Sequence, residues 1–348
     1  MIVCTQDTAV VILSYNGRKW HEQFLPLIIS EAGQDYEVII IDNASTDDTL
    51  PYIHEHFPAV KTVQVRINRG FAHGYHEGLK QIQAKYYVLL SADFEVTHGW
   101  FPPLLHAMQR YPGLAACQPK IRYWRDREYF EYAGAGGGFK DKWGYLFCRG
   151  RIFGDLEKDQ GQYDDEIEVF WASGGCFMVR ADLYHKLGGL DTDFYAHMEE
   201  VDLCWRLKNA GYRIGYVGQS TVYHVGGSVI SYGSPQKLYY NFRNSLILLL
   251  KNEKAIRLLW LFPLRLVLDG IAGLQLLAGG KFRSMLIIVK AHFHFYGHLR
   301  RWLRHRKEAQ QHVAHRNEVG IYPKSIIWQY FALRKKTFGK LRWEPPRL

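Results

Sequence analysis

The chain has 348 residues, of which 47% are hydrophobic and 22% charged, a composition typical of a globular protein with a sizeable core. It contains no low-complexity tract and no repeat, which excludes a disordered protein and a solenoid. The formal net charge of +10 is unevenly distributed, because residues 251–348 contain 20 Lys and Arg against 5 Asp and Glu. A basic C-terminal part indicates an anionic partner, either a membrane surface or a nucleic acid.

The cysteines and the N-terminus indicate the compartment. The five cysteines are widely spaced and include no C-x-x-C pair, which favours a reducing compartment over a disulfide framework or a zinc ribbon. The N-terminal sequence MIVCTQDTAVVIL has no basic segment followed by a long apolar stretch, so it does not read as a signal peptide. We therefore expect a cytoplasmic protein.

The first third of the chain alternates strand and helix patterns. Ser45 and Asp48 resemble a capping box that opens a helix toward His56, and apolar residues at helical spacing predict helices at 71–82 and 100–108. Strands joined by helices predict a doubly wound α/β sheet. Continuous apolar runs, typical of strands buried on both faces, occur at 9–13, 37–41, 62–65, 86–90 and 115–117.

Short polar side chains follow four of these predicted strands. In doubly wound sheets, ligands bind beyond the carboxyl ends of the strands, so we expect the functional site at this edge. Packing alone does not account for four polar strand ends in a row. The polar clusters lie at residues 14–16, 42–43, 68–70 and 91–93.

Two of these clusters are candidates for nucleotide binding. Asp42 can accept a hydrogen bond from the imide N–H of uracil or thymine, but an Asx turn accounts for Asp42 and Asn43 equally well. The segment NRGFAHG, residues 68–74, leads into a helix. Its glycines allow close backbone approach and the helix N-terminus favours a diphosphate, whereas the alternative is a simple helix start.

A metal site is a further candidate. Asp93 and Glu95 follow the apolar run at 86–90, where hard oxygen ligands would suit Mg²⁺ or Mn²⁺ bridging a diphosphate. An acid pair at a strand end is more often a solvated turn, so this interpretation needs a partner. His224 ends a second apolar strand pattern and is such a partner, although a single histidine there is usually structural.

The sequence MEEVD at residues 198–202 opens a predicted helix that runs to Ala210. Acids in the first turn stabilise the helix dipole, and Asp202 can pair with Arg206 one turn later. This explanation suits Asp202 better than it suits Glu199 and Glu200. Neighbouring carboxylates raise one another's pKa, so one of these two glutamates is a candidate general base.

The rest of the chain divides into two parts. Residues 120–230 are rich in glycine and aromatic residues and show no pattern of a second sheet. We therefore expect one domain over residues 1–230, with a donor half at residues 1–119 and an acceptor half at residues 120–230. From residue 231 the chain becomes apolar and basic. Pro263, Arg265 and Asp269 interrupt the apolar segment 255–277, which argues against the roughly 20 apolar residues of a spanning helix.

An amphipathic pattern follows. One face of a predicted helix is apolar and the other is rich in Arg, Lys and His, which favours a helix lying in a membrane interface over one packed on the main body. We predict that residues 231–348 attach the protein peripherally to the inner face of the plasma membrane. The apolar residues of this face are Phe282, Leu286, Val289, Phe293, Tyr296 and Leu303.

Eight segments, taken in order, resemble the family 2 inverting glycosyltransferases with the GT-A fold, a Rossmann-like, mostly parallel sheet flanked by helices. They agree in order and spacing over about residues 8–250, and YYNFRNSLILLLKN, residues 239–252, is similar to the tail of bacterial rhamnosyltransferase-like members. The segments are VVILSYNG (10–17), IIIDNASTDDT (39–49), NRGFAHG (68–74), LLSADFEV (89–96), WASGGCFMVR (171–180), GGLDTDF (188–194), MEEVDLCWRLKNAGYRI (198–214) and VYHVGG (222–227).

The resemblance implies roles for the residues at matching positions. Asp93 would match the last acid of the family's DxD motif and His224 its distal metal ligand, while Glu200, beside Glu199, would take the position of the catalytic base. Trp171 and Gly174 would face the donor sugar or the acceptor. The donor nucleotide would be bound by Tyr15, Asn16, Asp42, Asn43, Asn68, Gly70, Phe71 and Gly74.

Two positions depart from the family pattern. Ser91 stands where the first acid of the DxD motif commonly lies, which leaves the metal with fewer protein ligands. Glu200 replaces the usual Asp and adds one methylene to the base. Both departures are compatible with catalysis if the diphosphate and water complete the metal shell, as Mg²⁺ often prefers.

The implied activity is inverting transfer of a hexose, such as rhamnose, from a UDP- or dTDP-sugar to a hydroxyl of a cell-surface polysaccharide or lipid-linked glycan precursor. Two alternatives remain. A nucleotidyltransferase would have a basic phosphate-binding loop near the N-terminus, which residues 15–17 do not form. A non-catalytic protein binding a membrane or nucleic acid would leave Asp93, Glu199 and Glu200 unexplained, and we expect no nucleic-acid partner.

Overall fold

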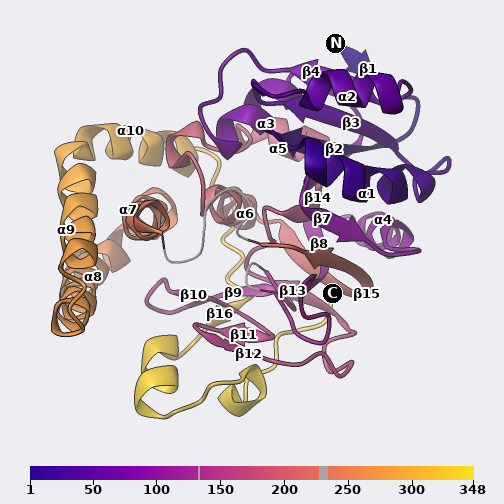
Figure 1. The fold of residues 1–348 in the computed structure, drawn as a ribbon. Coiled ribbons are helices and arrows are strands. Elements are labelled where there is room, and N and C mark those ends of the chain that lie inside the picture. The colour runs from indigo at the N-terminus through magenta and orange to yellow at the C-terminus, as the bar shows by residue number, and fades with distance from the viewer. Residues whose placement is uncertain (132–133, 227–233) are drawn as a thin grey trace.

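The computed structural model describes residues 1–131, 134–226 and 234–348, which form ten α-helices and sixteen strands (Figure 1). The helices are α1 (Arg18–Ser30), α2 (Thr49–His56), α3 (Phe71–Leu79), α4 (Phe101–Arg110), α5 (Ala181–Lys186), α6 (Glu199–Asn209), α7 (Pro235–Asn252), α8 (Ala255–Ala278), α9 (Phe282–Gly297) and α10 (Leu299–Gln310). The strands are β1 (Ile2–Val3), β2 (Thr8–Ser14), β3 (Glu37–Asp42), β4 (Lys61–Gln64), β5 (Ile82–Gln83), β6 (Tyr86–Ser91), β7 (Phe94–Val96), β8 (Leu114–Tyr123), β9 (Gly138–Asp141), β10 (Leu146–Cys148), β11 (Arg151–Ile152), β12 (Asp155–Leu156), β13 (Glu166–Val169), β14 (Cys176–Arg180), β15 (Arg213–His224) and β16 (Ile321–Tyr322).

The largest sheet has nine strands, eight of them in the order β13-β15-β8-β14-β6-β2-β3-β4, with β7 paired to β15. Strands β6, β2, β3 and β4 are parallel to one another, which confirms the predicted doubly wound sheet. Strand β14 lies antiparallel between β6 and β8, while β15 runs parallel to β8. The sheet is therefore mixed on the side of the later strands.

The continuous apolar runs of the first strands arise because both faces of this sheet are covered. Along β2, Val10 and Ile12 belong to the core shared with α1, α2 and α4. Ala9 and Val11 belong to the opposite core, which contains residues of α3, α5 and α6. Because successive side chains of a strand point to opposite faces, a strand buried on both faces shows no polar alternation.

Two local predictions in this half need correction. Helix α2 begins at Thr49 with Asp48 at the N-cap, and neither Asp48 nor Ser45 caps it, because the Ser45 hydroxyl instead accepts a hydrogen bond from the Asn16 backbone N–H at 3.0 Å. Helix α3 ends at Leu79, and Ile82 lies in the short strand β5, paired with Ile2 of β1. An apolar residue at helical spacing can thus serve a strand as well.

The prediction that the middle section has no sheet of its own was wrong. A five-stranded sheet has the order β12-β11-β10-β9-β16, and its strands are only two to four residues long. Strand β16 comes from the C-terminal part, which returns to the main sheet as well, since the Glu168 N–H donates to Pro346 O at 2.9 Å. Residues 231–348 are therefore more than a helical extension. The predicted boundary at residues 230 and 231 lies outside the described residues.

Helices α7 to α10 form the helical part of the C-terminal region, and α8 and α9 lie side by side at one edge of the molecule (Figure 1). Helix α8 continues through Pro263, and by length and composition it could cross a membrane, although Pro263, Arg265 and Asp269 were expected to leave its apolar run too short. Arg265 and Asp269 are buried, and Asp269 lies 3.1 Å from His292 of α9. The single helix predicted over Phe282–Leu303 is two helices, since α9 ends at Gly297.

Candidate active site

The sheet brings the predicted polar strand ends together. Ser14 at the end of β2 pairs in register with Asp42 at the end of β3, and Leu13 pairs with Ser91 at the end of β6. These are the carboxyl ends of parallel strands, where an α/β sheet binds ligands. The expected edge of the sheet is therefore present.

Asp42 forms the expected Asx turn, while its contact with a nucleotide base stays a prediction. Its Oδ2 accepts a hydrogen bond from the Ser45 N–H at 3.2 Å, which closes an Asx turn. Its Oδ1 is buried and has no hydrogen-bond partner among the described residues. Leaving a buried polar atom unsatisfied costs about 1–3 kcal/mol, which an N–H from a ligand would recover.

The neighbouring residues on this edge are held by hydrogen bonds between loops. Asn16, whose φ is 49°, accepts a hydrogen bond from the Thr46 N–H at 2.8 Å, and Tyr15 beside it is exposed. Asn43 donates to Asn68 Oδ1 at 3.1 Å. The hydrogen bonds between Asn16 and Thr46 thus hold the loop of the exposed Tyr15 to the loop that follows the buried Asp42.

The segment 68–74 contacts the loop that precedes Glu199. Gly70 has φ 99°, and a Cβ there would lie 2.5 Å from Tyr195 O, so only glycine fits. A Cβ on Gly74 would lie 2.6 Å from the Leu13 side chain. Phe71 is partly buried against the Tyr75 ring, with 5.0 Å between centroids. Close packing at both glycines explains their place in the predicted donor segment.

Asp93 and His224, predicted as metal ligands, lie together. Strands β7 and β15 pair antiparallel with His224 opposite Phe94, which brings the side chain of the preceding Asp93 to the imidazole. Asp93 Oδ2 lies 3.2 Å from His224 Nε2, and the imidazole stacks on the Phe94 ring with 4.3 Å between centroids. The two residues are 131 positions apart in the chain, so the fold creates this pair.

Glu131 is a site residue that the sequence did not reveal. Only 1% of it is exposed, and its Oε2 lies 3.3 Å from His224 Nδ1. It precedes the glycine-rich segment after β8 and belongs to no motif, so only the folded structure shows its place. Burial lowers the pKa of His224, but the carboxylates of Glu131 and Asp93 outweigh burial and raise it to about 10.

These side chains fit a divalent cation. Asp93 offers a carboxylate oxygen and His224 offers the imidazole nitrogen that faces it. Mn²⁺ and related ions accept both types of ligand. A carboxylate on the second ring nitrogen, here Glu131, is the usual support of a metal-binding histidine. Glu95 does not join them, because its carboxylate accepts hydrogen bonds from Trp124 at 2.7 Å and Arg127 at 2.8 Å.

Glu200 lies at the N-terminus of α6, against Gly174. A Cβ on Gly174 would lie 3.2 Å from Glu200 Cβ, which places the predicted sugar-facing glycine beside the predicted base. Burial raises the pKa of Glu200 to about 7, although nearby backbone amides, including that of Gly174, lower it. A carboxylate with a pKa near neutrality is suited to general-base catalysis.

Glu199 and Asp202 differ from Glu200 in environment. Burial and the adjacent Glu200 raise the pKa of Glu199 well above its ordinary value. Asp202 accepts a hydrogen bond from Arg206 at 2.8 Å, as predicted, and a second from Lys251 of α7 at 2.8 Å. Asp202 is therefore structural.

Gly174 and Gly175 lie between Glu200 and the Asp93–His224 pair. Gly175, next to Gly174, is so close to Phe94 that a Cβ there would lie 2.6 Å from its ring. Phe94 in turn stacks on His224. In agreement, the carboxylates of Glu131 and Glu200 both raise the pKa of the buried Cys148 thiol, after burial itself.

Trp171 lies apart from this group. It is buried, its indole N–H donates to Phe139 O at 3.1 Å, and its ring packs directly against the backbone of Gly138. The side chain thus joins the second sheet to the interior. Its contact with a sugar stays a prediction.

The mixed sheet and the acidic and histidine side chains at its edge define a glycosyltransferase with the GT-A fold. The chain belongs to glycosyl transferase family 2, whose family model matches residues 9–188.

Relatives and solved structures agree with this assignment. The chain is 25% identical over 289 residues to the N-acetylglucosaminyl-diphospho-decaprenol L-rhamnosyltransferase of Mycobacterium tuberculosis, covering 78% of this chain and 92% of that protein. Rhamnosyltransferase WbbL of Escherichia coli is 36% identical over 55 residues, 16% of this chain and 20% of WbbL.

Two solved structures share the fold at low sequence identity. GalNAc-T7 with UDP, GalNAc and Mn²⁺ aligns with a TM-score of 0.55 at 16% identity, covering 70% of this chain and 47% of that one. The mannosyltransferase PcManGT of Pyrobaculum calidifontis, in complex with GDP-Man and Mn²⁺, aligns with a TM-score of 0.50 at 17% identity, covering 88% and 85%.

Proposed function

We propose that this enzyme transfers a hexose, rhamnose by analogy with its mycobacterial relative, from a nucleotide-diphosphate donor to a hydroxyl of a lipid-linked glycan precursor. The transfer inverts the anomeric carbon and takes place at the inner face of the plasma membrane. The observation that supports this most is the position of Glu200, a partly buried carboxylate with a pKa near 7 beside the Asp93–His224 pair.

On the donor side, Asp42 accepts the imide N–H of uracil or thymine through its unsatisfied Oδ1, and the Tyr15 ring stacks on the base. This assignment favours UDP- or dTDP-sugars. Guanine offers a different pattern of donors and acceptors, so a GDP-sugar fits Asp42 less well.

Asp93 and His224 would hold a divalent cation, Mg²⁺ or Mn²⁺, with Glu131 orienting the imidazole. When bound, the cation neutralises charge that develops on the departing diphosphate. Since Ser91 offers no carboxylate, the protein would supply few ligands to the cation, and diphosphate oxygens and water would have to supply the others.

Glu200 accepts the proton of the acceptor hydroxyl as that oxygen attacks the anomeric carbon. The new C–O bond forms on the face opposite the diphosphate, whose bond to the sugar breaks, so a single displacement inverts the configuration. Burial and Glu200 raise the pKa of Glu199 well above its ordinary value, which disfavours a second negative charge next to the base.

A transfer assay with defined donors tests this proposal. We would offer UDP-, dTDP- and GDP-sugars, with and without Mn²⁺, together with a polyprenyl-diphosphate-linked N-acetylglucosamine. We expect product from a uridine or thymidine donor and only with the metal. Product from GDP-sugars alone would overturn the role of Asp42. If the enzyme hydrolysed the nucleotide-sugar but transferred the sugar to no lipid-linked glycan, the proposed acceptor class would be overturned.

An exposed apolar surface supports the membrane location. By length and composition, α8 could cross a membrane, and only 22% of its most apolar stretch is buried. Helices α8 and α9 pack together through Phe262 and Phe295, whose ring centroids are 5.6 Å apart, and each leaves an apolar stripe exposed. We call these residues the apolar face: Ile256, Leu259, Trp260, Leu266, Val267, Ile271, Leu274, Leu277, Phe282, Leu286, Val289, Phe293 and Tyr296.

The charges around the apolar face match a lipid surface. Monomeric proteins rarely expose apolar patches of this extent without a partner. The buried Arg265–Asp269–His292 cluster keeps the charges of α8 on the side of the protein, away from this face. Exposed basic side chains beside the face suit anionic headgroups, and they are Lys281, Arg283, Lys290, Arg300 and Arg304.

We expect the double variant Leu259→Glu/Phe293→Glu to lose binding to anionic vesicles by at least about tenfold, because each buried large apolar side chain contributes about 1.5–3 kcal/mol. These two side chains are 73% and 75% exposed, so the changes leave the core intact. Co-sedimentation with phosphatidylglycerol vesicles measures the effect. The matched control, Leu156→Glu/Leu333→Glu, changes exposed leucines elsewhere, and equal losses in both variants would contradict this surface.

A further inference from the structure

The segment Asp193–Met198, which we call the base loop, leads directly into Glu199 and Glu200 and has a strained backbone. Tyr195, His197 and Met198 have φ values of 66°, 69° and 73°, in the left-handed region that residues other than glycine rarely adopt. Each such residue costs of order 1–3 kcal/mol and persists only where surrounding contacts enforce it. The base loop therefore needs an external support.

Helix α7 supplies that support through Asn244. This residue is 0% exposed, and its Nδ2 donates to three backbone carbonyls of the base loop. The acceptors are Phe194 O at 3.2 Å, Ala196 O at 3.0 Å and His197 O at 2.7 Å. The buried side-chain amide of Asn244 thus binds the backbone on both sides of Tyr195 and at His197, where φ is positive.

Arg243 completes the contact from the same helix. Its guanidinium donates to Asp193 O and Phe194 O, both at 2.9 Å. Its Nε donates to Asn244 Oδ1 at 2.8 Å, which fixes the amide with its NH₂ group toward the loop. The two side chains together bind the backbone carbonyls of four residues of the base loop: Asp193, Phe194, Ala196 and His197.

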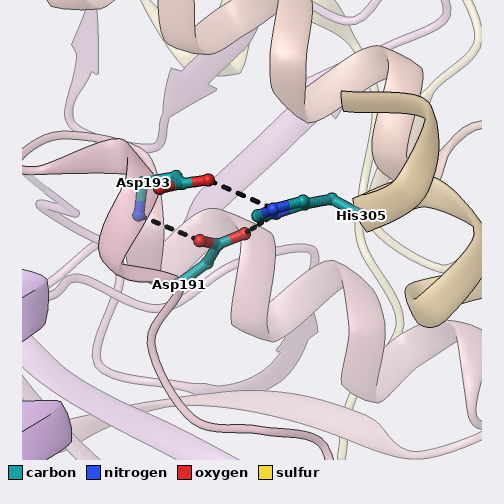
Figure 2. Close-up of side chains that lie close together, drawn as sticks. All are labelled: Asp191, Asp193 and His305. Carbon is teal, nitrogen blue, oxygen red and sulfur yellow. Dashed lines mark hydrogen bonds and ion pairs between the residues drawn. The ribbon is translucent and has the colours of Figure 1, made fainter. Parts of the chain in front are cut away.

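The start of the base loop is also anchored to α10. Figure 2 shows Asp191 and Asp193 together at the tip of the His305 side chain, whose two ring nitrogens each lie 3.2 Å from one carboxylate. These ligand atoms lie close enough together for a cation, within 4.8 Å. However, Lys251 lies 2.6 Å from Asp191, and Arg301 donates to Asp193 at 2.8 Å, so both carboxylates are already neutralised. We read this group as an ion-pair anchor.

We propose that Asn244 and Arg243 are positioning residues for Glu200, holding the base loop in the strained form that sets the carboxylate beside Gly174. This inference rests on the proposed role of Glu200 as the base. The same loop contacts the donor segment, since Ala72 N–H donates to Tyr195 O at 3.5 Å. Helix α7 therefore sets the base and one wall of the donor site together.

The test compares Asn244→Ala with the wild-type enzyme in a transfer assay. A catalytic group displaced by about 1 Å loses about 100-fold in rate, and we expect a fall in kcat of that order. Glu200, released from its buried position, regains an ordinary carboxyl pKa, so the rise of kcat/KM with pH moves to lower pH. Asn244→Asp should behave alike, because an acceptor would then face three carbonyls.

Asn209→Ala is the matched control. Asn209 is a buried asparagine at the far end of α6, and its Nδ2 also donates to a backbone carbonyl, Asn252 O, at 3.1 Å. We expect it to lower the melting temperature as Asn244→Ala does, but to leave the pH profile in place. If both variants lost activity only in proportion to stability, with one unchanged pH profile, the positioning role would be refuted.

Two further variants keep the outcome readable. Should Asn244→Ala not fold, Arg243→Lys tests the same point, because lysine keeps the charge but cannot span two carbonyls. Glu200→Gln distinguishes a failure of the proposed base from a failure of the positioning role. Full activity in that variant would overturn the proposed base itself, whereas an inactive Glu200→Gln with an unaffected Asn244→Ala would overturn only the positioning role.

Discussion

Glu200→Gln is expected to lower the rate of sugar transfer about 1,000-fold while donor affinity stays close to that of the wild type. General-base catalysis contributes typically about 10²–10⁴-fold, and glutamine has the shape of glutamate but cannot accept the proton. The substitution also preserves the packing against Gly174. Single-turnover transfer and calorimetric donor binding, measured on the same protein, give the two quantities separately.

Glu199→Gln is the control for this prediction. Because burial and Glu200 raise the pKa of Glu199 well above its ordinary value, a neutral amide resembles the form that this environment favours, and transfer should survive. In the wild-type enzyme, kcat/KM should rise as pH increases and level off above about 7, since only the ionised form of Glu200 accepts a proton. Loss of activity in Glu199→Gln with retention in Glu200→Gln would reverse the two assignments.

His224→Ala and Asp93→Asn are expected to abolish detectable Mn²⁺ binding in the presence of a nucleoside diphosphate, because each removes one of the few protein ligands. Glu131→Gln should weaken Mn²⁺ binding about 10- to 100-fold, the usual effect of removing the partner of a metal-binding histidine. Electron paramagnetic resonance of free Mn²⁺ measures this affinity without any transfer reaction.

Glu95→Gln provides the comparison for the metal variants. Glu95 lies on the same strand as Phe94, yet its carboxylate is bound by Trp124 and Arg127. We expect its Mn²⁺ affinity to match that of the wild type. Equal weakening in Glu95→Gln and Asp93→Asn would indicate a general electrostatic effect of the acidic surroundings, and unchanged affinity in His224→Ala would exclude His224 as a ligand.

The sequence predicts the parallel strands of residues 1–119 well, because the relevant signals are local. The apolar runs ending in Ser14 and Asp42 fix buried parallel strands, and parallel strands bring their carboxyl ends together. That Asp93 and His224 lie together is predicted by the order of the family's motifs along the chain, and not by the local sequence around either residue. Its geometry depends on the pairing of β7 with β15.

The features that the sequence missed depend on contacts between distant residues. The second sheet consists of very short strands, one of which, β16, comes from near the C-terminus. Glu131 and Asn244 belong to no chemical motif, and their roles appear only when His224 and the base loop are placed beside them. Likewise, Arg265 and Asp269 look like interruptions of an apolar segment, but the fold buries both against α9.

The anomeric configuration of the transferred sugar tests the central claim most directly. The product of the transfer assay, analysed by NMR through the C1–H1 coupling of the new linkage, reports how the bond formed. A single displacement assisted by Glu200 gives a product whose configuration is opposite to that of the donor. Retention of the donor's configuration would require a different arrangement of catalytic groups and would contradict this account.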